Sequence, residues 1–295
     1  MIRNILLIII AVAAIVFIVQ WRRSVRSRNG DSTVAKPSLL QIAIGFVTDF
    51  LDTLGIGSFA TTATAFKSLR VVDDERIVGT MIVGHSLPVV AQAFIFLVVV
   101  QVDPRVLATL TLASVLGAWF GAGIACRLPR RPIQIGIGIG LFAAAFFMLL
   151  SQLGMFPAGG TALTLTTGML TIAIVINFIL GITLMLGIGH YAPSLIFFSL
   201  LGLDPRAVFP IMMSSGALMA MAGGLRFMKA GCFDRRAAMG LTLGGIPGAL
   251  VAGLIVRSLP LGVLRWMVIL VVLYAAAMMI RSALSQRRAR VAQTV

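Results

Sequence analysis

Two short glycine motifs interrupt long apolar segments of the chain. Leu54-Gly-Ile-Gly-Ser58 stands within the first segment and Leu186-Gly-Ile-Gly-His190 within the second. Each glycine disfavours a helix by about 1 kcal/mol, and the backbone groups exposed at a break must line a protein-enclosed cavity, because hydrocarbon cannot hydrogen-bond them. A half-helix that begins at such a break points its free N–H groups and the positive end of its dipole into that cavity. The motifs therefore predict an anion site.

The backbone and the neutral side chains at these motifs are the expected substrate contacts. The glycines assigned to the site are Gly55, Gly57, Gly187 and Gly189. Ser58 and Thr61 lie at the start of the half-helix that follows the first break, where their hydroxyl groups can hydrogen-bond an oxyanion. The alternative interpretation of the glycines is close packing between helices. Their paired placement favours site backbone.

Two aspartates precede the first break within the same apolar segment. Asp49 and Asp52 are spaced i, i+3, which places them on one face of a helix. A carboxylate repels an anion unless it is protonated, so Asp52, together with Asp49, is a candidate for proton coupling. The alternative is that Asp52 caps the broken backbone by accepting N–H bonds from Leu54 to Gly57.

Both histidines of the chain stand in apolar surroundings. His190 follows the second glycine motif, and its imidazole is a candidate either for substrate contact or for a structural hydrogen bond. His85 is a candidate for proton coupling, because an imidazole can exchange a proton near neutral pH. In the alternative, His85 satisfies a backbone carbonyl group that Pro88 leaves without its helical partner.

The composition defines the class of protein. Hydrophobic residues make up 59% of the 295 residues, charged residues make up 11%, and the mean hydropathy is +1.06, so a polytopic membrane protein is expected. The net charge of +15 comes from Lys and Arg clustered between apolar runs, which indicates membrane topology rather than a nucleic-acid surface. No cofactor is expected, and no Cys/His cluster has the spacing of a metal site. Cys126 and Cys232 are expected to be packing residues rather than a disulfide.

The N-terminal segment is expected to be a membrane anchor. Ile5 to Val19 is apolar enough for the core of a secretory signal, but arginines follow Trp21 and no small-residue cleavage site stands in a polar stretch. Residues 1–38 are therefore assigned to an uncleaved helix whose C-terminus faces the cytoplasm, followed by a basic loop. The remaining apolar segments are approximately 39–66, 77–100, 106–126, 133–153, 163–201, 208–228, 237–256 and 261–280.

The two segments that contain the glycine motifs are too long for one span of about 20 residues. If each is a re-entrant hairpin, 19 Lys and Arg face the cytoplasm and 5 face outside. If each is a single tilted span, the split is 14 to 10. The positive-inside bias favours the hairpins, although two adjacent full spans within 163–201 remain an alternative.

This topology exposes an internal repeat. The glycine motifs are 132 residues apart, and a Gly-rich stretch that ends at Pro129 matches one that ends at Pro260, at an offset of 131. The expected fold is therefore all-α and polytopic: an N-terminal anchor, then two repeats over residues 39–155 and 160–282, and a basic cytoplasmic tail over 283–295. Each repeat consists of a broken re-entrant hairpin and three transmembrane helices. Because three is odd, the second copy is expected to be inverted, as in secondary transporters.

The residues that carry this repeat also carry a family resemblance. Gly45-Phe-Val-Thr-Asp-Phe-Leu-Asp-Thr-Leu-Gly-Ile-Gly57, its partner Leu186-Gly-Ile-Gly-His-Tyr-Ala-Pro193, and the segments before Pro129 and Pro260 resemble the TauE/SafE family of sulfite exporters. The resemblance covers residues 39–282. It implies movement of small sulfur-containing or carboxylate anions across the bacterial cytoplasmic membrane, usually outward. One departure is Thr61, which stands where the second copy has Pro193.

The sequence thus predicts a multi-pass inner-membrane secondary transporter for a small anion, with a proton as candidate coupling ion and alternating access between the two repeats. Membrane lipid and a second copy of the chain are the other partners considered, and nucleic acid is excluded. Two other functions are the alternatives. A non-transporting scaffold or assembly factor would not require two equivalent glycine breaks. An intramembrane hydrolase would use Ser58 as nucleophile and His190 as base, but the sequence has no Gly-x-Ser-x-Gly or His-Glu-x-x-His motif.

Overall fold

The computed structural model describes residues 2–27, 36–54, 57–99, 103–128, 153–155 and 160–255, together with isolated positions between 132 and 150. Over these residues the chain is helical, with a single isolated bridge between Ala162 and Leu203. The helices are α1 (Ile2–Ser27), α2 (Leu39–Thr53), α3 (Ser58–Ser68), α4 (Asp74–Val99), α5 (Pro104–Ala125), α7 (Thr167–Met185), α8 (Tyr191–Leu200), α9 (Pro205–Ala230) and α10 (Arg235–Ile255). Six helices in the described residues are long and apolar enough to cross a membrane, namely α1, α4, α5, α7, α9 and α10. A polytopic membrane protein is therefore confirmed.

Local capping explains where several helices begin. Ser38 and Gln41 form a capping box at the start of α2. The carboxylate of Asp103 accepts a hydrogen bond from the N–H of Arg105 at the start of α5, where Pro104 occupies the first helical position. Thr164 donates its hydroxyl to the same carboxylate, and this hydrogen bond lowers the pKa of Asp103 below its ordinary value.

The helix breaks fall at the two glycine motifs, as predicted. α2 ends at Thr53 and α3 begins at Ser58, while α7 ends at Met185 and α8 begins at Tyr191. Gly57 and Gly187 each have φ of 93°, a left-handed conformation that favours glycine. With 11 and 10 residues, α3 and α8 are too short to cross the hydrocarbon core alone. Gly55 lies outside the described residues, and the hairpin course of both segments stays a prediction.

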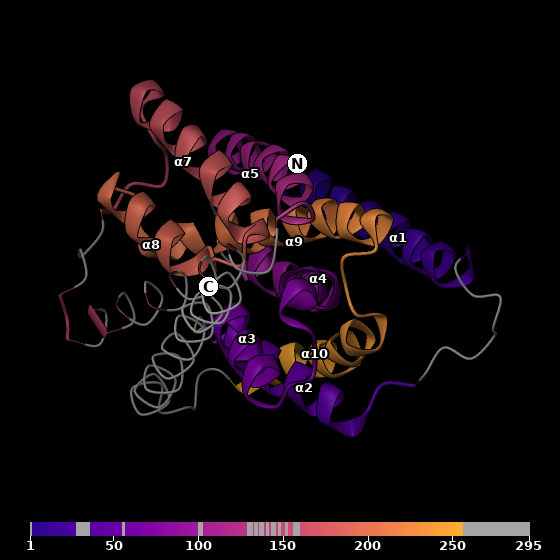
Figure 1. Cartoon of the computed structure of the whole chain (residues 1–295). Coiled ribbons are helices and arrows are strands. Elements are labelled where there is room, and N and C mark those ends of the chain that lie inside the picture. The colour runs from indigo at the N-terminus through magenta and orange to yellow at the C-terminus, as the bar shows by residue number, and fades with distance from the viewer. Residues whose placement is uncertain are drawn as a thin grey trace, which may run out of the picture.

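Helices that are distant in sequence pack together in a regular pattern. α2 packs against α10 and α7 packs against α5, while α4 and α9 cross the middle of the bundle and pack against each other (Figure 1). α10 also packs against α4, and α5 packs against α9. The packing repeats when α2, α3, α4 and α5 are matched in order with α7, α8, α9 and α10. The pair of α2 and α10 then corresponds to the pair of α7 and α5, and the pair of α4 and α10 corresponds to the pair of α9 and α5.

Glycines at two corresponding positions permit close contact between the paired helices. A Cβ atom on Gly117 of α5 would clash with the carbonyl oxygen of Phe178 in α7, and a Cβ atom on Gly248 of α10 would clash with the carbonyl oxygen of Phe46 in α2. The two pairs occupy corresponding places in the repeated sequence. Gly117 and Gly248 are therefore close-packing residues.

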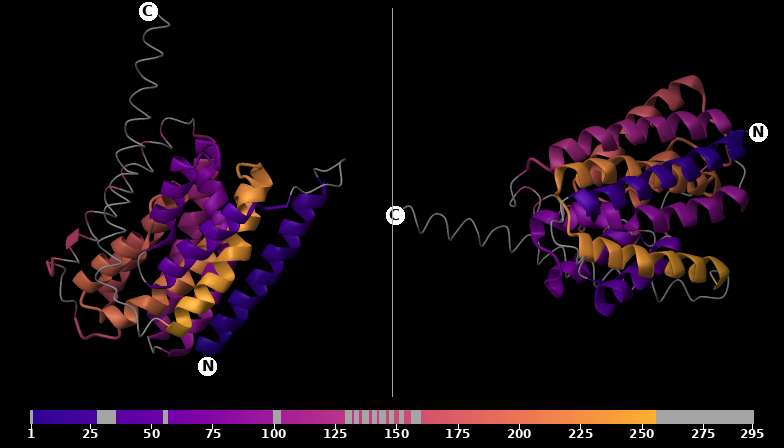
Figure 2. Two further views of the ribbon diagram at one scale, coloured as in Figure 1. Left: turned by 90° about the horizontal axis from the view of Figure 1, so that it is seen from below. Right: turned by 90° about the vertical axis from the view of Figure 1, so that its right-hand side faces the viewer.

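The N-terminal helix runs along the outside of the bundle, beside α9 (Figures 1 and 2). It presents a buried stripe at helical spacing, consisting of Leu6, Ile10, Ala14, Phe17 and Trp21. The ring of Phe17 packs against Gly224 of α9, where a Cβ atom would clash with the ring. The opposite face of α1 is apolar and exposed, as expected for a helix that faces lipid. This segment is therefore an integral part of the bundle.

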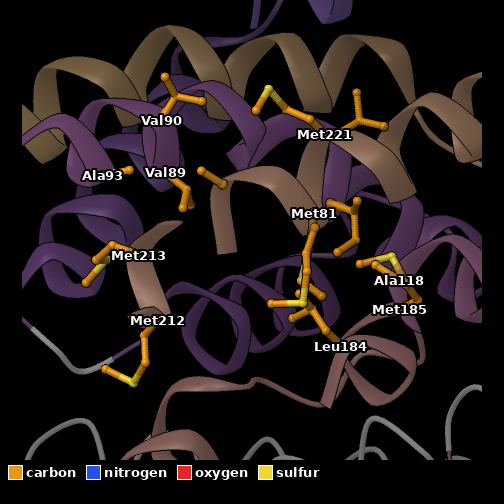
Figure 3. Packing of buried hydrophobic residues seen from close by; sticks show 14 of the residues in the cluster. Met81, Val89, Val90, Ala93, Ala118, Leu184, Met185, Met212, Met213 and Met221 are labelled. Carbon is orange, nitrogen blue, oxygen red and sulfur yellow. The ribbon is translucent and has the colours of Figure 1, made fainter. Parts of the chain in front are cut away.

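Methionine side chains fill much of the centre, where α4, α5, α7 and α9 meet. Figure 3 shows Met81 of α4, Met185 of α7 and Met212, Met213 and Met221 of α9 within one apolar cluster. Methionine is unbranched and flexible, so it fills irregular gaps between helices. This core surrounds the polar residues described next. The expected segments 133–153 and 261–280 lie largely or wholly outside the described residues.

Candidate functional site

Asp49 and Asp52 form the acidic part of a buried polar cluster on α2. Both side chains are fully buried, at 0% exposure, inside an otherwise apolar bundle. Their spacing places them on the same side of the helix, as the sequence predicted. Ionisable groups at this depth are costly unless they are hydrogen-bonded or paired, so their partners decide what the cluster can do.

Asp49 pairs with His85, which α4 contributes. Nδ1 of His85 lies 2.8 Å from Oδ2 of Asp49, and Nε2 lies 2.9 Å from the hydroxyl of Thr62 in α3. When Nδ1 carries the proton, it donates to the carboxylate and Nε2 accepts from Thr62. When both ring nitrogens are protonated, the hydroxyl of Thr62 accepts instead. Both ring nitrogens of His85 thus contact side chains, so His85 does not hydrogen-bond a carbonyl group freed by Pro88.

Asp52 closes the first helix break. Its Oδ1 accepts a hydrogen bond of 2.6 Å from the backbone N–H of Ser58, the first residue of α3. The predicted capping role is thus present, one residue beyond the expected stretch Leu54 to Gly57. A carboxylate at this point occupies the N-terminal end of a helix, which is the place where the free N–H groups would attract an anion.

Tyr191 joins this cluster from the other half of the chain. The phenolic oxygen of Tyr191, the first residue of α8, lies 3.4 Å from Oδ2 of Asp52, 3.3 Å from Oε1 of Gln92 and 3.3 Å from Sδ of Met213. The single phenolic proton can serve only one acceptor at a time. Gln92 in turn donates to the carbonyl oxygen of Asp49 at 3.4 Å. The network therefore connects α2, α4, α8 and α9.

The two glycine breaks meet across the same region in a reciprocal way. A Cβ atom on Gly57 would lie 3.8 Å from the ring of Tyr191, and a Cβ atom on Gly189 would lie 3.7 Å from Cβ of Phe59. Gly189 and Tyr191 stand 132 positions after Gly57 and Phe59. Each break thus faces the aromatic residue that follows the other break.

The remaining predicted residues lie near the breaks but differ in where they point. Ser58 is buried, with 2% exposure. The hydroxyl of Thr61 hydrogen-bonds the carbonyl oxygens of Ser58 and Gly57 within its own turn. Nε2 of His190 lies 3.3 Å from the carbonyl oxygen of Met212, which is the geometry of the structural alternative. Gly187 shapes the turn after α7 through its positive φ angle.

A second buried polar group lies apart from the acidic cluster, between α5, α7 and α9. Nδ2 of Asn177 donates to the carbonyl oxygen of Leu110 and lies 3.5 Å from the hydroxyl of Ser215. The hydroxyl of Thr111 lies 3.4 Å from those of Ser214 and Ser215. These contacts pair the polar groups with one another, so the group stabilises helix packing.

Sequence reasoning missed Tyr191 and Thr62 as members of the cluster. Thr62 stands among several threonines and alanines of α3, and no pattern distinguishes it. Tyr191 carries a usable signal, because it directly follows the second glycine motif and adds a hydroxyl group at the position where the first copy has Phe59. A polar aromatic residue at the start of a half-helix can reach across a break.

These features define a polytopic helical membrane protein with a buried polar site between two broken helices. The family model for the sulfite exporter TauE/SafE matches residues 1–148, half of the chain. The protein therefore belongs to the TauE/SafE family, and since this is a family of transporters, it is a membrane transport protein rather than an enzyme. The resemblance to this family is thereby confirmed over residues 1–148, which contain the first glycine motif. No curated protein sequence and no solved structure matches the chain.

Chemically, the site combines groups that can bind an anion with groups that can exchange a proton. Gly57 and His190 provide no side-chain cap for the starts of α3 and α8. At α3 the N–H of Ser58 is held by Asp52 instead, and N–H groups at such a helix start can bind either a carboxylate or an oxyanion. Asp49 and His85 can share a proton between Oδ2 of Asp49 and Nδ1 of His85, and Asp52 competes directly for the N–H of Ser58.

Proposed function

We propose that the protein is a secondary transporter of small anions, such as sulfite, organosulfonates or small carboxylates, that works by alternating access between two inverted repeats. The observation that carries this proposal is the reciprocal contact between the breaks, in which Gly57 faces Tyr191 and Gly189 faces Phe59. A site shared in this way changes when either half moves, which is the requirement for alternating access.

Two further observations support the inverted arrangement. The packing of α2 on α10 corresponds to that of α7 on α5, and α4 and α9 pair with each other at the centre. The charge distribution gives 19 Lys and Arg on the cytoplasmic side only when both broken segments are re-entrant. Together with the family membership, these features support a location in the bacterial inner membrane.

The acidic residues indicate how a proton would take part. The carboxylate of Asp52 holds the N–H of Ser58 at 2.6 Å, so an anion at the same N–H must displace a group of its own charge. Protonation of Asp52 removes that charge and weakens its hydrogen bond. Anion binding and proton binding at Asp52 are therefore expected to favour each other. Asp49, three residues earlier on α2 and paired with His85, is the candidate relay for the proton.

The experiment that tests the function uses purified protein in proteoliposomes. Exchange of radiolabelled sulfite, taurine and acetate across the vesicle membrane is measured against empty vesicles. Gly189→Val places a branched side chain against Phe59 and is expected to abolish exchange. Gly168→Val is the matched control, because a Cβ atom at Gly168 would meet nothing within 4 Å, and it should leave exchange unchanged.

The results separate the proposal from the scaffold alternative. A scaffold would show no exchange of any anion in well-folded protein, and this outcome would reject the proposed function. Exchange that is unchanged in Gly189→Val would retain the transporter but remove the second break from its site.

A further inference from the structure

A basic pocket lies away from the polar site, where α1 crosses α5 and α9. Its volume is about 620 Å³. The residues that line it are Val16, Gln20, Arg23, Ser24, Trp119, Leu225, Arg226, Met228 and Lys229. Three of these residues carry a positive charge, and none carries a negative charge. The pocket therefore attracts an anionic group.

One of the three cations is held in place by an aromatic residue. Arg226 donates from Nη1 to the carbonyl oxygen of Trp119, and its guanidinium carbon lies 5.1 Å from the centre of the Trp119 ring. Arg23 and Lys229 are exposed, and the ion pairs found among the described residues, Lys67 with Asp74 and Asp49 with His85, include neither of them. Arg226 thus forms a fixed wall, while Arg23 and Lys229 are available to a ligand.

The pocket lies at the end of the membrane-spanning helices. Arg23 is near the end of the candidate span Asn4–Ser24, and Lys229 is near the end of Pro210–Ala230. The end of a span is the level of the lipid headgroups, and Trp119 is of the residue type enriched there. The basic segments 21–38 and 226–236 adjoin the pocket. Both fall on the cytoplasmic side whether the two broken segments are re-entrant hairpins or single tilted spans.

An apolar surface continues from this pocket toward the middle of the bilayer. On α1, Ile8, Val12 and Ile15 are exposed at 54–63%. On α5, Leu112 and Leu116 are exposed at 62% and 48%. A ligand whose charged part enters the pocket can therefore lay hydrocarbon chains along the two helices, which a free inorganic anion has no means to do.

We propose that this pocket binds the phosphate headgroup of an anionic phospholipid of the inner leaflet, such as phosphatidylglycerol. Arg23 and Lys229 contact the phosphate, Arg226 stands behind it on Trp119, and the acyl chains cover the exposed faces of α1 and α5. The lipid thereby joins the outer helix α1 to α9. Basic pockets between spans on the cytoplasmic side are suited to such headgroups.

The test is native mass spectrometry of the purified full-length chain with phosphatidylglycerol and with phosphatidylcholine of identical acyl chains. We expect one retained phosphatidylglycerol and weaker retention of phosphatidylcholine, whose headgroup has no net charge. The double variant Arg23→Gln/Lys229→Gln should bind phosphatidylglycerol about thirtyfold more weakly, as expected for the loss of two Lys or Arg contacts to an anionic headgroup. The charge-matched control Arg22→Gln/Arg235→Gln changes residues outside the pocket lining and should bind as the unmodified chain does.

A second arm separates a lipid from a free anion. The melting temperature of the protein in detergent should rise with dihexanoyl phosphatidylglycerol and should not change with the same concentration of sodium phosphate. Equal retention of the two lipids, full retention by the double variant, or an equal rise with sodium phosphate would each overturn the proposal. Monodisperse elution of the double variant confirms that it folds, and since neither residue belongs to the buried polar site, this result is independent of the proposed transport function.

Discussion

Replacing Asp52 by asparagine tests the proposed link between anion and proton most directly. Asparagine keeps the shape of the side chain, and its carbonyl oxygen can still accept the N–H of Ser58, but it carries no charge and cannot titrate. In the unmodified protein the affinity for anions should rise as the pH falls, by up to tenfold per pH unit over the range in which Asp52 takes up its proton. In Asp52→Asn this pH dependence should disappear.

The size of the effect follows from the geometry of the cap. Oδ1 of Asp52 lies 2.6 Å from the N–H nitrogen of Ser58, so an anion that takes over this donor would have its charge about 5 Å from the displaced carboxylate. At that separation and an effective dielectric constant of about 20, the repulsion is about 3 kcal/mol. Above the titration range, Asp52→Asn should therefore bind the anion about two hundredfold more tightly than the unmodified protein.

The assay is binding of a radiolabelled alkylsulfonate, whose charge does not change between pH 5 and 8, to purified protein over this range, followed by transport in proteoliposomes. Accumulation driven by a proton gradient should be lost in Asp52→Asn, while exchange of anions without a gradient should survive. Asp73→Asn is the control, because Asp73 is exposed in the turn before α4. An unchanged pH dependence and normal uphill transport in Asp52→Asn would refute the reasoning, and a variant that no longer folds would assign Asp52 to capping alone.

Three further outcomes are expected. Tyr191→Phe removes the hydroxyl group that reaches Asp52 from the other half, so transport should fall at least tenfold while the melting temperature changes little, and undiminished transport would contradict a role for this contact. Gly117→Ala should lower the free energy of unfolding by about 1–3 kcal/mol, because the added Cβ atom clashes with the backbone of α7. A melting temperature equal to that of the unmodified protein would contradict this prediction. Ser68 and Thr161 are both exposed, and cysteines introduced at these positions of a cysteine-free variant should be labelled from opposite sides of the membrane, with position 68 facing the cytoplasm. Labelling of position 68 only from outside would reject the hairpins.

The helices were predictable because their signals are local. Apolar segments of membrane length placed α4, α5, α9 and α10 within a few residues of their observed ends, and the glycine pairs placed both breaks. The start of α5 follows from Asp103 and Pro104, which supply a cap and a fixed first turn. Such features depend on neighbours within one turn of helix, and a single sequence contains them.

The site was predictable only in part, because its contacts join distant segments. The aspartates before the break indicated a polar site, but no local pattern pairs Asp49 with His85 across 36 positions or Asp52 with Tyr191 across 139. These pairings depend on how α4 and α8 cross α2, which the packing of whole helices determines. The hydrogen bond of His190 to the carbonyl oxygen of Met212 depends likewise on the approach of α9.

The packing of α2 against α10 has a consequence for the order in which the protein is made. α2 is synthesised about 190 residues before α10, yet Gly45 of α2 lies directly against the backbone of Leu241. During this interval α2 is in the membrane with two aspartates and without its main neighbour, and contacts between such distant segments form slowly. The final packing of α2 therefore waits for the insertion of α10, so assembly of the bundle is a late, cooperative event.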